Sequence, residues 1–175
     1  GQVNVISLVG DGAATALDIG SVTTIGGSGI VFNGGPGVGD TLSVDATGAD
    51  VRINGVVTLN SSVVITTGSS VSGDVTFTND SPIDAQGGES NNLTLTAGTG
   101  SVFFNEDIGT TETIGALTIT RADGGVFFGE SDTETSGGGT TGPVNSVSTD
   151  AAIDIGSTNV IAGGIMLNGG AMSIA

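Results

Sequence analysis

Two neighbouring stretches decide the fold: NNLTLTAGTGSVFFNEDIG at residues 91–109 and ALTITRADGGVFFGE at residues 116–130. In each, an alternating run that begins at Leu93 or Leu117 is followed nine residues later by Val-Phe-Phe. Short alternation bounded by Gly, Asn and Asp predicts β-strands with one buried face. The same two strands recur in the same order, so the second stretch repeats the first.

This pair of strands recurs along most of the chain. Copies begin at residues 17, 42, 63, 93, 117 and 153, and in the first and last copies the second strand is expected at residues 30–33 and 165–168. Successive copies therefore begin 21 to 36 residues apart. A repeat of this length with two or three short strands is typical of a parallel β-solenoid, in which like residues stack from coil to coil. We therefore predict an all-β chain that forms one domain over residues 1–175, a parallel β-solenoid (β-helix) of about seven short coils, with a long loop at residues 129–143. An antiparallel sandwich or barrel is the alternative, although it would need hairpin turns between most strands.

The composition excludes several classes of function. The chain has 175 residues, of which 33 are Gly, 18 are acidic and two are basic; it has no His, Cys, Trp or Tyr, and its net charge is −16. Without His and Cys the usual zinc, haem and iron–sulfur ligands are missing, as is the commonest catalytic base, so we expect no enzymatic activity. The negative charge argues against nucleic acid or an anionic membrane as a partner. No apolar run approaches the ~20 residues that span a bilayer, and no secretory signal pattern is found, so we expect a mature chain or a fragment.

The two stretches, together with GDVTFTND at residues 73–80, resemble the degenerate strand repeats of very large bacterial exoproteins. These are the filamentous-haemagglutinin-like and autotransporter-passenger proteins. The resemblance covers about residues 17–170 and implies a right-handed β-helix without a catalytic signature. Because such proteins are usually far longer, it also implies either an excised segment or a small subunit that regains length by assembly.

Acidic residues in predicted loops indicate candidate calcium sites, since calcium prefers hard oxygen ligands. The candidate ligands are Glu106 and Asp107 in one loop and Glu130, Asp132 and Glu134 in the long loop. Calcium is the one cofactor that the sequence suggests. The alternative is a solvated acidic surface that keeps the chain soluble by charge repulsion.

Two polar patterns accompany the strands. Asn recurs at the end of the second strand, at Asn33, Asn54, Asn105 and Asn168, with Asn79 close by. This recurrence predicts a ladder of side-chain amides from coil to coil, and a glycan contact is the alternative. Thr-x-Thr triplets occur at residues 76–78, 94–96, 118–120 and 133–135. Outward Thr rows could match an ice lattice, but Asp and Arg at comparable places in other coils break the array, and Thr also simply suits exposed strand positions.

A row of apolar residues is predicted to face outward. If the first and third residues of each Val-Phe-Phe run point inward, the pleat directs the middle residues, Phe103 and Phe127, outward. Val31 and Met166 are expected in the same slot of their coils, with Arg52 as the exception. Contiguous exposed apolar residues usually mark an interface, so we expect a lateral protein contact here. The alternative is that the long loop covers this row.

Both ends of the chain read as ordinary strands, with Val3 and Val5 near one end and Ile174 near the other. A solenoid normally closes with polar caps, because an open coil exposes unpaired backbone groups and a bare core. We therefore expect the end strands to pair with other copies of the chain.

The combined prediction is a secreted or cell-surface structural protein, the subunit of a filament (a homopolymer) built by end-to-end β-strand pairing. Two alternatives stay open: a passenger-type adhesin segment that binds a host or neighbouring-cell ligand, and a calcium-dependent surface-layer or matrix component. A β-helical polysaccharide lyase or hydrolase is disfavoured, because Arg52 and Arg121 are the only cations and no Trp or Tyr could hold a sugar.

Overall fold

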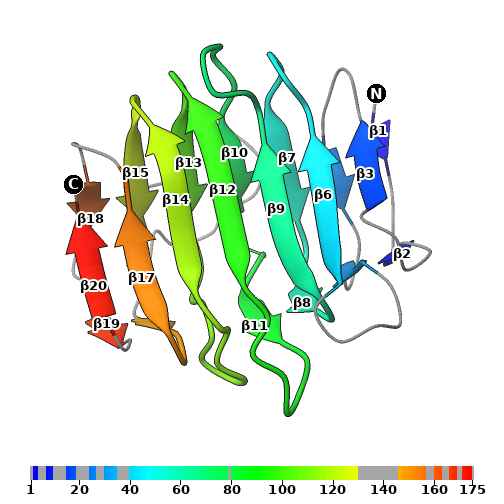
Figure 1. Cartoon of the computed structure of the whole chain (residues 1–175), viewed down its shortest axis with the longest axis vertical. Coiled ribbons are helices and arrows are strands. Elements are labelled where there is room, and N and C mark those ends of the chain that lie inside the picture. Colours follow the sequence, from blue (N-terminus) through cyan, green and yellow to red (C-terminus); the bar gives the residue numbers. More distant parts are fainter. Residues whose placement is uncertain are drawn as a thin grey trace.

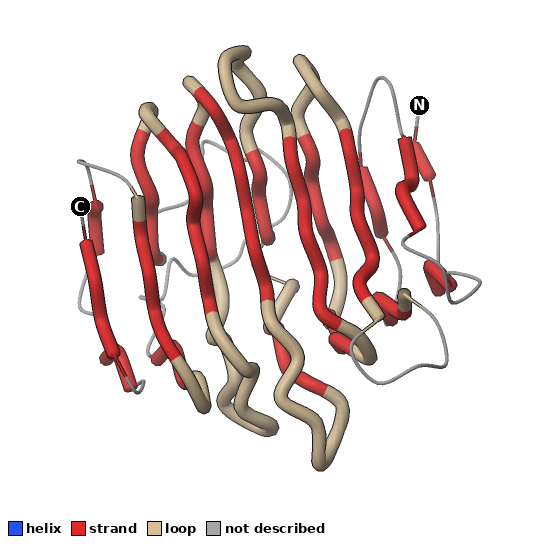
Figure 2. The backbone as a smooth tube through the Cα atoms, viewed as in Figure 1, coloured by secondary structure: helices blue, strands red, loops and turns tan. Residues whose placement is uncertain are grey.

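The computed structural model is all-β, and no helix occurs among the residues that it describes (Figures 1 and 2). It describes the backbone of residues 2–3, 7–9, 15–18, 24–26, 30–34, 40–78, 80–129, 146–156, 160–162, 166–168 and 171–174, and the side chains of residues 30–34, 40–78, 80–129 and 147–156. Neighbouring strands in every sheet are parallel. The fold is therefore a parallel β-solenoid, as the repeats predict.

Three sheets form the walls of the solenoid, and each coil passes through them in the order A, B, C. Sheet A contains β1 (Gln2–Val3), β4 (Thr24–Gly26), β7 (Val51–Asn54), β10 (Val75–Phe77), β13 (Ser101–Phe104), β15 (Gly125–Phe128) and β18 (Val160–Ala162). Sheet B contains β2 (Ser7–Val9), β5 (Ile30–Asn33), β8 (Val57–Leu59) and β11 (Ile83–Ala85), and it continues through bridges of Ile108 to β16 (Ser146–Ser148) and β19 (Met166–Asn168). Sheet C contains β3 (Thr15–Asp18), β6 (Thr41–Asp45), β9 (Ser62–Thr66), β12 (Leu93–Gly98), β14 (Leu117–Ala122), β17 (Ala152–Ile155) and β20 (Ala171–Ile174).

The winding can be followed in Figure 1. Sheet C lies in front with its strands pointing upward, and sheet A lies behind with its strands pointing downward. Successive coils advance from the N-terminal side at the right to the C-terminal side at the left, which makes the solenoid right-handed. Sheets A and C contain seven strands each, one from each coil.

The core consists of columns of like residues that run along the solenoid axis. In sheet A, one column is formed by Val51, Val75, Val102 and Val126, and the next by Ile53, Phe77, Phe104 and Phe128. The rings of Phe77 and Phe104 stack at a centroid distance of 5.3 Å, and those of Phe104 and Phe128 at 5.2 Å. In sheet C, one column is formed by Leu42, Val63, Leu93, Leu117 and Ile153, and the next by Val44, Ile65, Leu95, Ile119 and Ile155. All these side chains are at most 2% exposed, so the inward faces of the strands that contain them are removed from water.

The corner between sheets C and A needs small residues because backbones approach one another closely there. Ala46, Thr67, Ala97 and Ala122 follow or end the sheet C strands and are fully buried. Gly98, which ends β12, has a φ of +57°, and a Cβ atom there would lie 2.3 Å from the carbonyl oxygen of Gly68. Only glycine combines this left-handed backbone with this contact.

Two strand assignments made from the sequence are wrong. Along the chain, the sheet C strands β3 and β17 are followed by the sheet A strands β4 and β18. Residues 30–33 and 166–168, which the sequence placed in that position, form strands of sheet B instead. Both missed strands have only three residues, and Thr24–Gly26 contains a single large apolar side chain. A strand this short shows no alternation of apolar and polar residues, so only its pairing with the neighbouring strands of the sheet identifies it.

Candidate functional site

The outward row of sheet A contains a pair of stacked aromatic rings. Phe103 in β13 and Phe127 in β15 are register partners, their ring centroids are 4.8 Å apart, and both side chains are partly exposed. They alternate with the inward Phe104 and Phe128, which confirms the predicted direction of the pleat. On one side the row continues to Thr76.

Val31 and Met166 do not belong to this row, contrary to the sequence prediction. Val31 lies in β5 of sheet B, where its register partners are Ser7 and Thr58, and Met166 lies in β19, where its partner is Ser146. The reason is the misassigned strands described above. The residue in register with Phe127 in the next coil is Ile161 of β18.

The predicted assembly residues at the ends occupy opposite ends of the solenoid. Val3 lies in β1, the first strand of sheet A, in register with Ile25. Ile174 lies in β20, the last strand of sheet C, in register with Ile155. Val5 lies outside the described residues.

The predicted calcium ligands are only partly brought together. Glu106 and Asp107 follow β13 at the corner between sheets A and B, where the carbonyl oxygen of Asp107 accepts the Ile83 amide at 3.1 Å. Burial raises the pKa of the Glu106 carboxyl, and the charges of Asp107 and Asp80 raise it further, while a backbone hydrogen bond at Asp107 opposes the shift. Among the described residues, no group of three or more acidic side chains has the geometry to hold a metal ion. Three further candidates, Glu130, Asp132 and Glu134, lie outside the described residues.

The predicted asparagine ladder is wrong as a single stack. Asn54 and Asn105 follow the same column of sheet A, but Thr78 lies between them and donates its hydroxyl to Oδ1 of Asn54 at 2.7 Å. Oδ1 of Asn105 is buried and has no hydrogen-bond partner among the residues that the structure describes. The other members, Asn33 and Asn168, end strands of sheet B, and the nearby Asn79 lies outside the described residues.

The Thr-x-Thr triplets do not form one array either. Thr94 and Thr118 are register partners on the outer face of sheet C, but a register shift places Thr96 beside Arg121. The triplet at residues 76–78 belongs to sheet A, with Thr76 and Thr78 buried, and residues 133–135 lie outside the described part of the chain. The described rows therefore give only two adjacent coils of matched threonines.

Several acidic side chains cap backbone amides of the next coil, a role that the sequence did not suggest. Oδ1 of Asp50 accepts the Asp74 amide at 2.9 Å, and Oδ1 of Asp74 accepts the Ser101 amide at 2.7 Å. On another corner, Oδ1 of Asp84 accepts the Thr111 amide at 2.9 Å. These bonds satisfy donors where the sheet ladder is interrupted, and they give part of the acidic composition a structural purpose.

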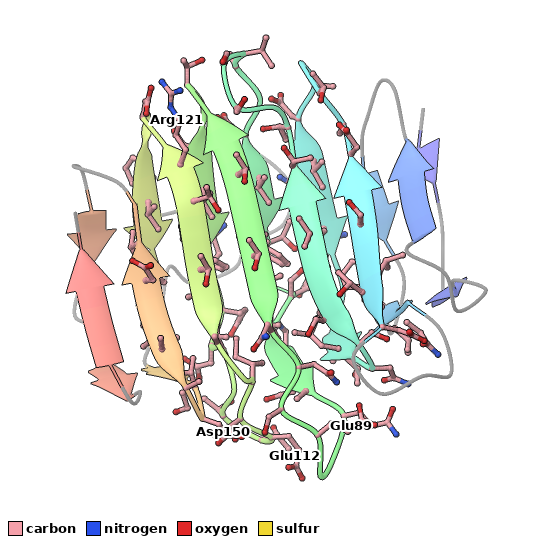
Figure 3. All side chains as sticks on the ribbon, in the orientation of Figure 1. Glu89, Glu112, Arg121 and Asp150 are labelled. Carbon is pink, nitrogen blue, oxygen red and sulfur yellow. The ribbon has the colours of Figure 1, made fainter. Side chains whose placement is uncertain are left out.

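A second acidic group lines the corner between sheets B and C, where Figure 3 shows Glu89, Glu112 and Asp150 along the lower edge. Oδ1 of Asp150 accepts the Thr113 hydroxyl at 2.6 Å, and its Oδ2 accepts the Ser90 hydroxyl. Hydrogen bonds from Ser90 and then Thr113 lower the pKa of Asp150. This arrangement ties three successive coils together.

No protein-family model, curated protein or solved structure matches the chain. The resemblance to filamentous-haemagglutinin-like and autotransporter-passenger proteins therefore stays a prediction. In the part of the chain that the structure describes, no helix is long and apolar enough to cross a membrane.

Proposed function

We propose that the chain is a structural element of an extracellular or cell-surface rod, whose copies join end to end by parallel β-strand pairing. The observation that carries this proposal is the continuity of the core columns, in which like residues lie above one another coil after coil. All three sheets propagate along one axis, so a second copy can extend each of them without reversing its direction. Pairing of this kind satisfies edge amides and carbonyls and covers the end of the core.

If a second copy continues the sheets in register, the register within the chain indicates which residues would meet at the junction. In the register of sheet A, the row of positions that contains Arg52, Phe103 and Phe127 begins at Gln2 at one end and reaches Ile161 at the other. A second copy that continues this row places its Gln2 beside Ile161 of the first. Neighbouring parallel strands lie about 4.8 Å apart, a Cα separation that a disulfide can bridge.

Engineered cysteines test this junction on a clean background, because the natural chain has no Cys. The variant that carries both Gln2→Cys and Ile161→Cys should form a ladder of covalent multimers under mild oxidation. Assembly should increase with salt, because the net charge of −16 repels neighbouring copies and the Debye length falls to about 10 Å at 0.1 M. Denaturing gel electrophoresis without reductant and negative-stain microscopy are the two measurements.

The matched control carries Val3→Cys with Ile161→Cys, which is one residue out of register. Each single-cysteine variant is a second control. With one cysteine per copy, it can form covalent dimers but cannot form larger covalent multimers. Filaments without a cross-link would show that the register is wrong while assembly is right. Monodisperse short rods at all salt concentrations would contradict the proposal and favour a non-polymerising adhesin segment.

A further inference from the structure

Two Asn-Gly dipeptides in the described part of the chain lie at strand ends, one in sheet B and one in sheet A, and their glycine amides meet the same chemistry in the next coil. Asn33 is the last residue of β5 and Asn54 the last residue of β7, and Gly34 and Gly55 follow them. Asn-Gly is the dipeptide in which the backbone most readily attacks its own side chain, because glycine has no Cβ to hinder the approach. In both cases the glycine amide is bound by a buried serine of the following coil.

At the Asn54 corner, both groups that would react are tied to the next coil. The Gly55 amide donates to Oγ of Ser81 at 3.0 Å, and Thr78 donates its hydroxyl to Oδ1 of Asn54 at 2.7 Å. Oγ of Ser81 lies 2.8 Å from the Ile53 carbonyl oxygen and 3.1 Å from the Thr78 hydroxyl, and Ser81 is 1% exposed. The serine is therefore held firmly and excluded from water, whereas the Asn54 side chain is exposed.

The Asn33 corner repeats this arrangement, but one serine makes both of the contacts that Ser81 and Thr78 share at the Asn54 corner. The Gly34 amide donates to Oγ of Ser61 at 2.8 Å, and the same hydroxyl donates to Oδ1 of Asn33 at 3.4 Å. Ser61 is 4% exposed. Ser61 follows Gly34 by 27 residues and Ser81 follows Gly55 by 26, so both contacts depend on the stacking of coils rather than on local sequence.

The reaction that these contacts oppose is spontaneous deamidation. The glycine nitrogen bonds to Cγ of the asparagine, the Cγ–Nδ2 bond breaks, and ammonia leaves with the amide proton. Water then opens the resulting succinimide to aspartate or isoaspartate. To reach Cγ the nitrogen must turn away from the serine hydroxyl, and the asparagine must leave its extended strand conformation.

We propose that Asn33 and Asn54 are latent deamidation sites that Ser61 and Ser81 protect by holding the attacking glycine nitrogen. The protection matters for the fold, because isoaspartate adds an atom to the backbone at corners without spare room. A Cβ atom on Gly34, for example, would already lie 2.6 Å from the carbonyl carbon of Thr41. Deamidation would also add a negative charge to a chain whose net charge is −16.

The test is to incubate the folded wild type, Ser61→Ala and Ser81→Ala at mildly alkaline pH and to quantify aspartate and isoaspartate at each site by peptide mass spectrometry. Loss of one hydrogen bond corresponds to a factor of up to about ten. Ser81→Ala should therefore deamidate faster at Asn54 by up to about tenfold while Asn33 keeps the wild-type rate. Ser61→Ala should show the reverse, so each variant contains its own reference site.

Val57→Ala is the matched control, because it opens a cavity near the Asn54 corner, where the Val57 amide donates to the Pro82 carbonyl at 2.9 Å, and it leaves Ser81 in place. Its rate at Asn54 should stay close to that of the wild type. A rise at Asn54 in Val57→Ala as large as in Ser81→Ala, or an equal rise at both sites in either serine variant, would assign the protection to general rigidity and overturn the proposal. Unchanged rates in both serine variants would overturn it as well.

Thr78→Val provides a second variant that keeps the shape of the side chain. It removes only the hydroxyl bound to Oδ1 of Asn54, so deamidation at Asn54 should rise. If Thr78 instead polarises the carboxamide toward attack, the rate falls, and the protective role of the corner is contradicted.

Discussion

At the scale of single residues, neighbouring phenylalanines of β13 contribute differently to stability. Phe104 is the middle ring of an inward stack and is fully buried, whereas Phe103 stacks only with Phe127 on a partly exposed face. Phe104→Ala should lower the free energy of unfolding by about 3–5 kcal/mol. Phe103→Ala should lower it by about 1 kcal/mol, the value of an aromatic pair. Urea unfolding followed by circular dichroism measures both, and equal losses would contradict the assigned faces.

Glu106 should destabilise the folded chain at neutral pH. Its pKa is raised mainly by burial, so the folded chain binds a proton at this carboxyl more readily than the unfolded chain does. The contribution of such a group to stability is present at low pH and is lost as the pH rises through the folded-state pKa. Glu106→Gln should therefore raise the urea midpoint at pH 7, and its advantage over the wild type should shrink as the pH falls toward about 4.

Glu112→Gln is the control for this prediction, because it removes the same charge from an exposed loop side chain. A comparable pH-dependent gain in Glu112→Gln would show that the effect comes from net charge alone. A gain confined to Glu106→Gln would assign it to the burial of this carboxyl and to the charges of Asp107 and Asp80.

At the scale of elements, β13 and β15 could be predicted because their alternation is complete and their spacing from the preceding strand is the same. The strands β4 and β18 could not, since three residues flanked by glycine or lying between loops contain too little alternation to separate them from a turn. Their absence from the prediction shifted residues 30–33 into the wrong sheet, and with them Val31. The outward direction of Phe103 survived because it depends only on the pleat of its own strand.

The corner contacts could not be predicted for a different reason. Ser61, Ser81 and Asp74 act on residues of a neighbouring coil, and the corner loops differ in length from one coil to the next. A polar residue in a loop therefore gives no sign of which amide lies beside it. A prediction of these roles needs the register of all three sheets first.

The end of β14 is braced by an arginine that reaches back across two coils. Arg121 donates through Nη1 to the Ser69 carbonyl oxygen at 2.8 Å, and its Nε and Nη2 bind both carboxylate oxygens of Asp123. Arg121→Ala should leave the free energy of unfolding within about 1 kcal/mol of the wild type, because the ion pair is exposed. It should, however, increase hydrogen exchange in the turn at residues 68–72, since that turn loses its anchor.

Asp123→Asn is the companion variant for this brace. It keeps the contact between Arg121 and Ser69 and removes the charge of the partner, so exchange in the turn should change less than in Arg121→Ala. Equal protection of the turn in the wild type and in Arg121→Ala would mean that its own hydrogen bonds hold it, such as the bond from the Thr99 amide to the Val71 carbonyl.

At the scale of the whole molecule, the coil is the unit of stability, because sheets A and C advance together by one strand per coil, and sheet B advances with them through a strand or, at Ile108, a single bridge. Most described strand contacts are with the coil before or after rather than with distant parts of the chain. A solenoid of this kind is stabilised by nearest-neighbour interfaces that add approximately. One coil should therefore be removable if the columns on either side still match.

Deletion of residues 75–101 removes β10, β11, β12 and the first residue of β13, and it joins Asp74 to Val102. The register then places Val51 beside Val102 and Ile65 beside Ile119, so the core columns stay apolar throughout. We expect a cooperative β-solenoid whose free energy of unfolding is lower by about 1–4 kcal/mol, from the usual contribution per residue. Deletion of residues 75–85 removes fewer residues but takes strands from sheets A and B alone, which leaves β12 without its own coil. Circular dichroism and urea unfolding should show a greater loss of β-structure and of stability in this smaller deletion, because it removes part of a coil and so leaves the three sheets with unequal numbers of strands. A greater loss in the larger deletion would contradict the coil as the unit of the fold.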